Sequence, residues 1–138
     1  MRIMAIDYGD AHTGIAISDP TGFLTGFTTT ITAYRPEAVA ERVAALAAEH
    51  GVEELVLGHP RNMDGSLGPR AGKAEELAGR LRQITGLPVV LWDERRTTVD
   101  AHQILFNAGK NAKKRKKIVD AVAASLILEG YLTYRSTH

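Results

Sequence analysis

The sequence predicts an α/β fold in which one mixed five-stranded sheet carries helices on both faces. Two observations predict it. The first third of the chain holds three short strand-like runs, and the remainder alternates short apolar runs with segments of helical periodicity. A chain of 138 residues is the size of one domain, so we expect residues 1–138 to form a single domain.

The first three predicted strands cover residues 3–6, 14–18 and 27–32. The first is apolar and ends at Asp7, and the third is rich in β-branched residues. Glycine-containing turns separate the first strand from the second and the second from the third. Because these connections are short, the three strands should form an antiparallel meander.

Residues 37–50 and 70–85 show helical periodicity and end at Gly51 and Gly86. Their predicted buried positions are Val39, Val43, Leu46 and Ala47 in the first and Ala74, Leu77, Leu81 and Ile84 in the second. The strands predicted at 55–58 and 89–92 are wholly apolar, as expected for strands covered on both faces. Right-handed crossovers place both parallel to the first strand, with helices on both faces of the sheet.

Two more helices are predicted after the last strand. One begins at Thr97 or Thr98 and runs to about residue 108, and the other begins in a basic run and ends the chain. We expect Ile118, Val122 and Leu126 to form the buried stripe of the last helix, with neighbouring Val119, Ala123 and Ile127 alongside.

Composition excludes several classes of protein. The chain has no cysteine, which excludes disulfides, thiolate zinc sites and thiol nucleophiles. No apolar run approaches the roughly 18 residues of a membrane-spanning helix, and the first residues, which reach a carboxylate at Asp7, do not resemble a signal peptide. We therefore expect a cytoplasmic protein without a membrane partner.

Positive charge is concentrated in one segment. Residues 110–117 hold six of the 17 basic residues and no acid, which leaves 11 basic and 16 acidic residues elsewhere, a net charge of −5. A mildly acidic body with one basic segment suits a polyanionic partner. The alternative is an ordinary solvated start of a helix.

Polar residues follow each of the predicted parallel strands. Asp7 ends the first, His59 follows the second, and Asp93 and Glu94 end the third, so all should lie at one edge of the sheet. Asp120 is the only acid in residues 110–128 and is the natural third member of a cluster with Asp7 and Glu94. Converging carboxylates repel one another, and hard divalent cations such as Mg²⁺ or Mn²⁺ remove that cost. Two ions about 3.5–4 Å apart and bridged by Asp7 would fit. Spacing alone also allows Asp7 and Asp93 to be turn formers and Asp120 to be an acid at a helix start.

Four stretches together resemble a known family. They are DYGDAHTGIAISD at 7–19, GHPRNMDGSLGPRA at 58–71, DERRTT at 93–98 and DAVAASLIL at 120–128. In this order and spacing they resemble the YqgF family of pre-16S rRNA nucleases, also called Holliday junction resolvases. The match spans nearly the whole chain, from Arg2 to about Leu132.

The resemblance implies an RNase H-like three-layer fold related to RuvC-type resolvases. It also implies an endonuclease that depends on Mg²⁺ or Mn²⁺ and processes the 5′ end of pre-16S rRNA in ribosome biogenesis. The matching catalytic and metal-ligating acids are Asp7, Glu94 and Asp120. Alternatives are a Holliday junction resolvase acting in DNA recombination and repair, which needs a dimer, and a non-catalytic nucleic-acid-binding module. An actin-like sugar kinase or ATPase would need two such domains.

The expected partner is structured RNA or branched DNA. His12 occupies a position where the family usually has Arg, so the grip on phosphate there is weaker or depends on pH, or another arginine substitutes. The sequence leaves monomer and homodimer open. The residues predicted to contact nucleic acid are His12, Arg61, Ser66, Arg70, Arg95, Lys113, Lys114, Arg115, Lys116 and Lys117.

Overall fold

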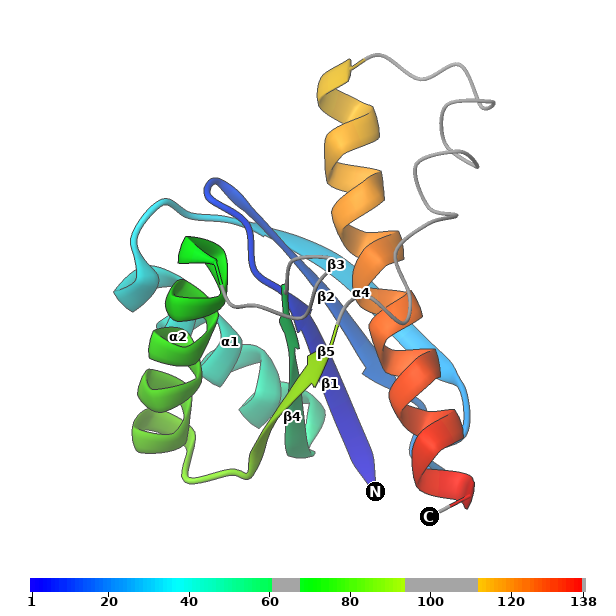
Figure 1. The fold of residues 1–138 in the computed structure, drawn as a ribbon. Coiled ribbons are helices and arrows are strands. Elements are labelled where there is room, and N and C mark those ends of the chain that lie inside the picture. Colours follow the sequence, from blue (N-terminus) through cyan, green and yellow to red (C-terminus); the bar gives the residue numbers. More distant parts are fainter. Residues whose placement is uncertain (61–67, 94–111, 138) are drawn as a thin grey trace.

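A computed structural model of the chain describes residues 1–60, 68–93 and 112–137, and over 112–120 and at 137 it describes the backbone alone. Five strands form one sheet in the order β3-β2-β1-β4-β5, with α1 and α2 on one face and α4 on the other (Figure 1). The strands are β1 (Arg2–Asp7), β2 (His12–Ser18), β3 (Thr25–Thr32), β4 (Val52–His59) and β5 (Val89–Asp93). The helices are α1 (Pro36–His50), α2 (Pro69–Thr85) and α4 (Ala112–Thr137).

The sheet has the predicted topology. β1 pairs antiparallel with β2 and parallel with β4, which in turn pairs parallel with β5. β2 and β3 complete the antiparallel meander. Both predicted helix ends are confirmed, because Gly51 and Gly86 follow α1 and α2 with φ angles of 65° and 70°, a left-handed conformation that glycine adopts without strain.

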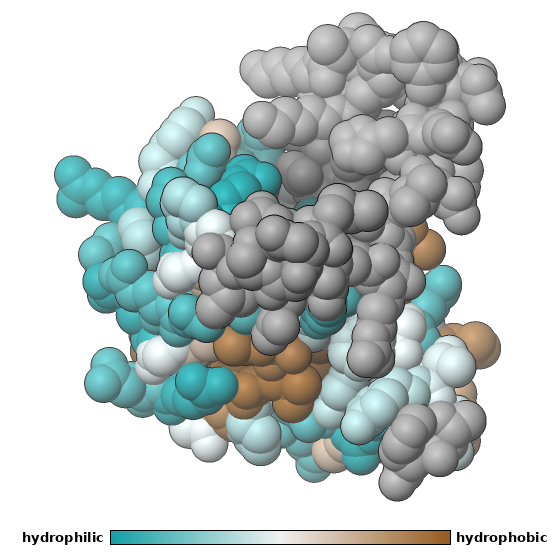
Figure 2. All heavy atoms as spheres, in the orientation of Figure 1, coloured by the Kyte–Doolittle hydropathy of each residue, from teal (hydrophilic) through white to brown (hydrophobic). Residues whose placement is uncertain are grey.

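Two apolar layers enclose the sheet because side chains of each strand alternate between its faces. Met4 and Ile6 of β1 pack in the layer under α1 and α2. Ile3 and Ala5 pack in the layer under α4, together with Trp92 of β5. β5 is an edge of the described sheet, and the space-filling view shows apolar surface over this strand, between α2 and α4 (Figure 2).

Three details differ from the sequence prediction. β4 continues to His59, so this histidine belongs to the strand instead of following it. Ile84 of α2 is 49% exposed, because α2 turns Leu77 and Leu81 toward the sheet and its last turn extends past the core. The helix predicted to begin at Thr97 or Thr98 lies outside the described residues.

The apolar face predicted for α4 is confirmed at Ile127 and wrong at Val122 and Leu126, which are only partly buried. The buried residues among the described side chains of α4 are Ala124, Ile127, Leu128, Tyr131 and Leu132. The side chains of Ile118 and Val119 lie outside the described residues. Apolar residues surround much of this helix, so periodicity does not select one face, and the small Ala124 side chain suits close approach to the sheet. Within the described ranges, no helix combines the length and the hydropathy required to cross a bilayer.

Candidate active site and nucleic-acid interface

Asp7 lies at the carboxyl end of the central strand. It is half-buried and, by alternation with Ile3 and Ala5, belongs to the face that α4 covers. Its neighbour on β2 is Gly14. On the other side, Ile6 pairs with Leu57, so Gly58 is the β4 residue level with Asp7. Both flanking positions are therefore glycine, and no side chain from either adjacent strand crowds the Asp7 carboxylate at that level.

The polar residues predicted at this edge divide between the two faces of the sheet. His59 pairs in register with Asp93 of β5, one residue beyond the level of Asp7. His59 is 4% exposed, and its Nε2 lies 3.2 Å from Oε1 of Glu75 on α2. By alternation with Leu91, Asp93 shares this α2 face. Glu94 lies outside the described residues.

Asp120 belongs to α4, where the structure describes the helical backbone but not this side chain. The position precedes Ala124 by four residues, Ile127 by seven and Leu128 by eight. Residues at these spacings share one side of a helix, so position 120 falls on the stripe with which α4 covers the sheet. Figure 1 shows the first turns of α4 extending beyond the sheet, and they contain Lys113, Lys114, Arg115, Lys116 and Lys117.

The described residues are compatible with a hard divalent cation at Asp7. Carboxylate oxygens are the ligands that Mg²⁺ prefers, and the residues level with Asp7 on both adjacent strands are glycines. No group of three or more His, Asp or Glu that could hold a metal occurs among the residues the structure describes. Glu94 and the Asp120 side chain, the other predicted ligands, lie outside them.

His12 begins β2 and shares the α4 face of the sheet with Gly14, two residues further along the strand. Its Nδ1 lies 3.2 Å from Oγ1 of Thr32 on β3, within hydrogen-bond distance. This contact ties one ring nitrogen to the edge strand. His12 and Asp7 thus occupy the same face on adjacent strands.

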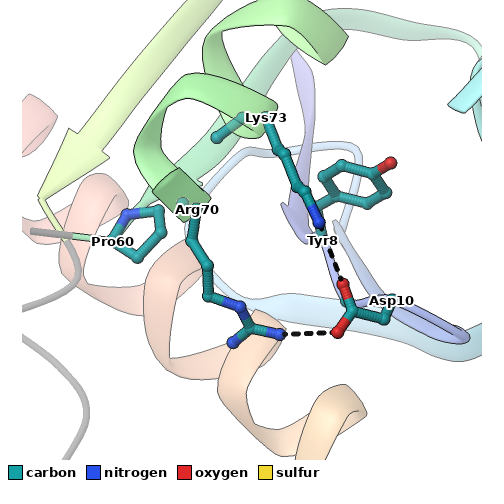
Figure 3. A pocket seen from close by; sticks show the side chains of 8 residues that line it. Tyr8, Asp10, Pro60, Arg70 and Lys73 are labelled. Carbon is teal, nitrogen blue, oxygen red and sulfur yellow. Dashed lines mark ion pairs between the residues drawn. The ribbon is translucent and has the colours of Figure 1, made fainter. Parts of the chain in front are cut away.

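A small open pocket lies on the other side of the β1–β2 turn (Figure 3). Nη2 of Arg70 is 3.6 Å from Oδ2 of Asp10, and Nζ of Lys73 is 3.7 Å from Oδ1 of the same carboxylate. Sequence analysis predicted Arg70 as a binding residue but missed Asp10 and Lys73. The three-residue spacing of Arg70 and Lys73 on a helix was the available signal. The pocket is lined by Tyr8, Gly9, Asp10, Gly58, Pro60, Arg70, Lys73 and Ala74.

The environment of this pocket favours the protonated form of Tyr8. Burial raises the pKa of the Tyr8 hydroxyl, and the carboxylates of Glu76, Asp10 and Glu37 raise it further. The hydroxyl is therefore a neutral group beside the charged ones. The predicted contacts Arg61, Ser66 and Arg95 lie outside the described residues.

The family described as "RuvX: Holliday junction resolvase" matches residues 1–134 of the chain. The chain belongs to the RuvX family. Its curated relatives include a "Putative pre-16S rRNA nuclease" of Halothermothrix orenii, 46% identical over 99% of this chain and 97% of that protein. A protein of the same description from Pelotomaculum thermopropionicum is 44% identical over 96% of this chain and 86% of its own length. The family predicted from the four motifs is confirmed, and with it the enzyme class, a nuclease.

Solved structures confirm the predicted fold of this RuvX chain. RuvC of Thermus thermophilus, solved in complex with a Holliday junction substrate, superposes with a TM-score of 0.64 over 99% of this chain and 96% of its own, at 16% identity. The fowlpox virus resolvase, solved with Holliday junction DNA, gives 0.58 over 98% and 99% at 12% identity. At these identities the likeness establishes the RuvC-type, RNase H-like fold alone.

Proposed function

We propose that this RuvX family member is a divalent-metal-dependent endonuclease that processes the 5′ end of pre-16S rRNA in the cytoplasm, acting as one domain of residues 1–138. The description of its curated relatives as pre-16S rRNA nucleases supports the substrate. One structural observation carries the proposal. Asp7 ends the central strand between Gly14 and Gly58, on the face covered by the helix that contains Asp120.

In this proposal Asp7, Glu94 and Asp120 hold Mg²⁺ or Mn²⁺. Position 120 falls on the sheet-facing stripe of α4, which covers the face of Asp7. Glu94 lies outside the described residues and is included from its place in the sequence motif. A bound pair of such ions supplies positive charge that activates water and stabilises the leaving oxygen of a phosphodiester. The three carboxylates would hold these charges in place at the carboxyl edge of the sheet.

The basic residues would hold the nucleic-acid backbone on both sides of this edge. Arg70 begins α2, and the basic turns at 113–117 begin α4, so the carboxyl edge of the sheet lies between two cationic helix starts. Contacts of this kind give affinity that depends on salt and little on sequence. His12, Arg61, Ser66 and Arg95 complete the proposed contact set.

A second function uses the same chemistry on a different substrate. The RuvX family carries the description of a Holliday junction resolvase, which favours cleavage of branched DNA. Symmetric nicking of two strands would require two copies of the site and therefore a dimer. Substrate preference and assembly state separate the two functions.

The test is a cleavage assay with the full chain on three substrates: a pre-16S rRNA 5′-leader, a four-way DNA junction and a linear DNA duplex. Each is incubated with Mg²⁺, Mn²⁺ or EDTA, and the products are mapped on sequencing gels. We expect metal-dependent cleavage of the RNA alone. Paired nicks in the junction would instead assign the resolvase function. Binding without cleavage under either metal would contradict both and leave a non-catalytic binding module.

A further inference from the structure

Asp10 is held by two cations that come from another element of the fold. Arg70 and Lys73 lie three residues apart at the start of α2, so they share one side of the helix. Both reach across the pocket to the Asp10 carboxylate in the turn after β1, at 3.6 and 3.7 Å (Figure 3). The pocket therefore already contains an oxyanion, supplied by the protein itself.

Another anion can easily replace Asp10 in its ion pairs with Arg70 and Lys73. The side chains of Arg70, Lys73 and Asp10 are 66%, 62% and 73% exposed. The two contacts are also longer than the 2.7–2.9 Å typical of a charge-assisted hydrogen bond. Exposed ion pairs of this kind contribute little to stability. A stronger anion can therefore displace Asp10 without disturbing the fold.

No acid in the first turn of α2 neutralises the positive side of the pocket. The helix begins after Gly68, which supplies no side-chain cap, and its first turn contains no acid. The partial positive charge of the helix start therefore adds to that of Arg70 and Lys73. Arginine pairs with phosphate through two parallel hydrogen bonds, which an exposed carboxylate at 3.6 Å does not achieve here.

Glycine at position 9 allows a tight turn before Asp10. A Cβ at Gly9 would meet the carbonyl oxygen of His12 at 2.3 Å, so the turn is closed against its own backbone. Asp10 is the next residue of this turn and lies within reach of Arg70 and Lys73.

We propose that Arg70 and Lys73 form a site for a backbone phosphate of the nucleic-acid substrate, and that Asp10 is an internal competitor for that site. This inference rests on the proposed function. In the free protein the carboxylate occupies the two cations, and on binding a phosphate replaces it. Asp10 therefore lowers the affinity of a nucleic acid that places a phosphate in this pocket, because the phosphate must first displace the carboxylate.

The test compares Asp10→Asn with Glu41→Gln, which removes the same charge from an exposed position on α1. Binding of labelled 5′-leader RNA, four-way junction and linear duplex is followed by fluorescence anisotropy in EDTA, at about 50–200 mM salt. We expect Asp10→Asn to tighten binding about two- to fivefold more than Glu41→Gln does, the size of one exposed ion pair. Asp10→Ser, which removes the same charge but carries no amide, should give the same gain.

Combining Asp10→Asn with loss of the two cations tests the mechanism directly. The gain from Asp10→Asn should disappear when Arg70 and Lys73 are both changed to Gln, because no cation then remains to be released. The Arg70→Gln variant alone should reduce the salt slope of binding by about one phosphate contact. A gain that persists without the two cations would overturn the proposal.

Failure of this inference and failure of the proposed function give different results. If the wild-type chain binds and cleaves nucleic acid but Asp10→Asn matches Glu41→Gln, only the role of Asp10 is overturned. If the wild-type chain binds none of the three nucleic acids at low salt, the proposed function is overturned and this inference with it.

Discussion

The two ends of the sheet differ in how their polar groups are held. At the end where β1 and β4 begin, Glu54 accepts hydrogen bonds from Tyr131 and Arg135 of α4, and its side chain is only 14% exposed. Nearby, the backbone N–H of Ile3 donates to Oγ of Ser18 at 2.9 Å. At the opposite end, the Asp10 carboxylate is 73% exposed and its ion pairs exceed 3.5 Å.

This difference separates contacts that stabilise the fold from contacts that a ligand can replace. Half-buried contacts with short distances are hard to replace by water or a ligand, and they fix α4 against β4. Exposed and longer contacts exchange readily. The Glu54 contacts therefore stabilise the fold, whereas the Asp10 contacts leave charges available for the proposed nucleic-acid substrate. His59 lies at the same end as Asp10 but is buried 3.2 Å from Glu75 and belongs with the structural contacts. Substitutions at the two ends should divide accordingly into changes of stability and changes of activity.

The largest expected effect is from Asp7→Asn. Loss of a proposed metal ligand should reduce cleavage by more than about a hundredfold, because even changes to groups behind the ligands cost 10- to 100-fold. Binding in EDTA and the melting temperature should change little. Asp93→Asn is the matched control, since Asp93 lies at the same edge but belongs to the opposite face by strand alternation. Equal losses in the two variants would contradict the assignment of Asp7.

Gly9→Ala should lower both the stability of the fold and its binding of nucleic acid. The added Cβ meets a backbone atom, the carbonyl oxygen of His12, at 2.3 Å, so the turn must move. We expect a loss of about 1–3 kcal/mol in the free energy of unfolding, the usual cost of overpacking, together with weaker nucleic-acid binding. Gly79→Ala is the control. A Cβ there has no neighbour within 4 Å, and the change should stabilise α2 by about 0.5–1 kcal/mol in chemical denaturation.

The strands, their relative directions and the helices on both faces of the sheet could be predicted from sequence. Hydrophobic periodicity and turn-forming residues, which give these features, are local signals. The buried stripe of α4 could not be predicted, since Ile118, Val122 and Leu126 compete with Ala124 and Ile127 in a helix that is apolar on several sides. Only packing against the sheet selects among these faces.

The candidate site shows the same limit. Asp7 was predictable because it ends an apolar strand, a feature visible in seven residues. The contact between Asp10 and Arg70 joins residues sixty positions apart and leaves no periodic trace. His59 was placed at the right edge, but its face depends on the strand continuing to residue 59, which only the structure establishes.

Tyr131→Phe tests the contacts at the end of the sheet where β1 and β4 begin. It removes the hydrogen bond from the Tyr131 hydroxyl to Oε1 of Glu54, 2.9 Å long, and should lower the free energy of unfolding by about 1 kcal/mol without changing cleavage. Tyr34→Phe, at a side chain that is 76% exposed, is the control and should change neither. A loss of activity in Tyr131→Phe would remove the division between the two ends.

Tyr131 should also make the free energy of unfolding depend on pH. Burial, with the hydrogen bond and charge of Glu54, raises the pKa of Tyr131 from 10.0 to about 12. The neutral hydroxyl is therefore favoured in the folded state, and its contribution is fully present below pH 10. It should be lost as pH rises from 10 to about 12, because the unfolded chain ionises first. Urea denaturation across this range should show a decline that is smaller in Tyr131→Phe.

The smallest effect is expected at Asp19, in the turn after β2. One carboxylate oxygen accepts hydrogen bonds from the Thr21 hydroxyl and from the backbone N–H groups of Gly22, Phe23 and Leu24. The Thr21 contact contributes most to lowering the pKa of Asp19 below its ordinary 3.8. Its stabilisation is therefore present above pH 3.8 and lost as pH falls through the lowered pKa.

Asp19→Ala should lower the melting temperature by about 1–3 °C at neutral pH, and the difference from wild type should shrink in acid. Asp19→Asn retains an acceptor oxygen without the charge and should fall between the two. Nucleic-acid binding should be unchanged in both variants, because this turn lies at the end of the sheet opposite Asp7 and the Arg70–Lys73 pocket. Binding that weakens in Asp19→Ala, measured by anisotropy in EDTA, would extend the nucleic-acid interface to both ends and contradict the comparison.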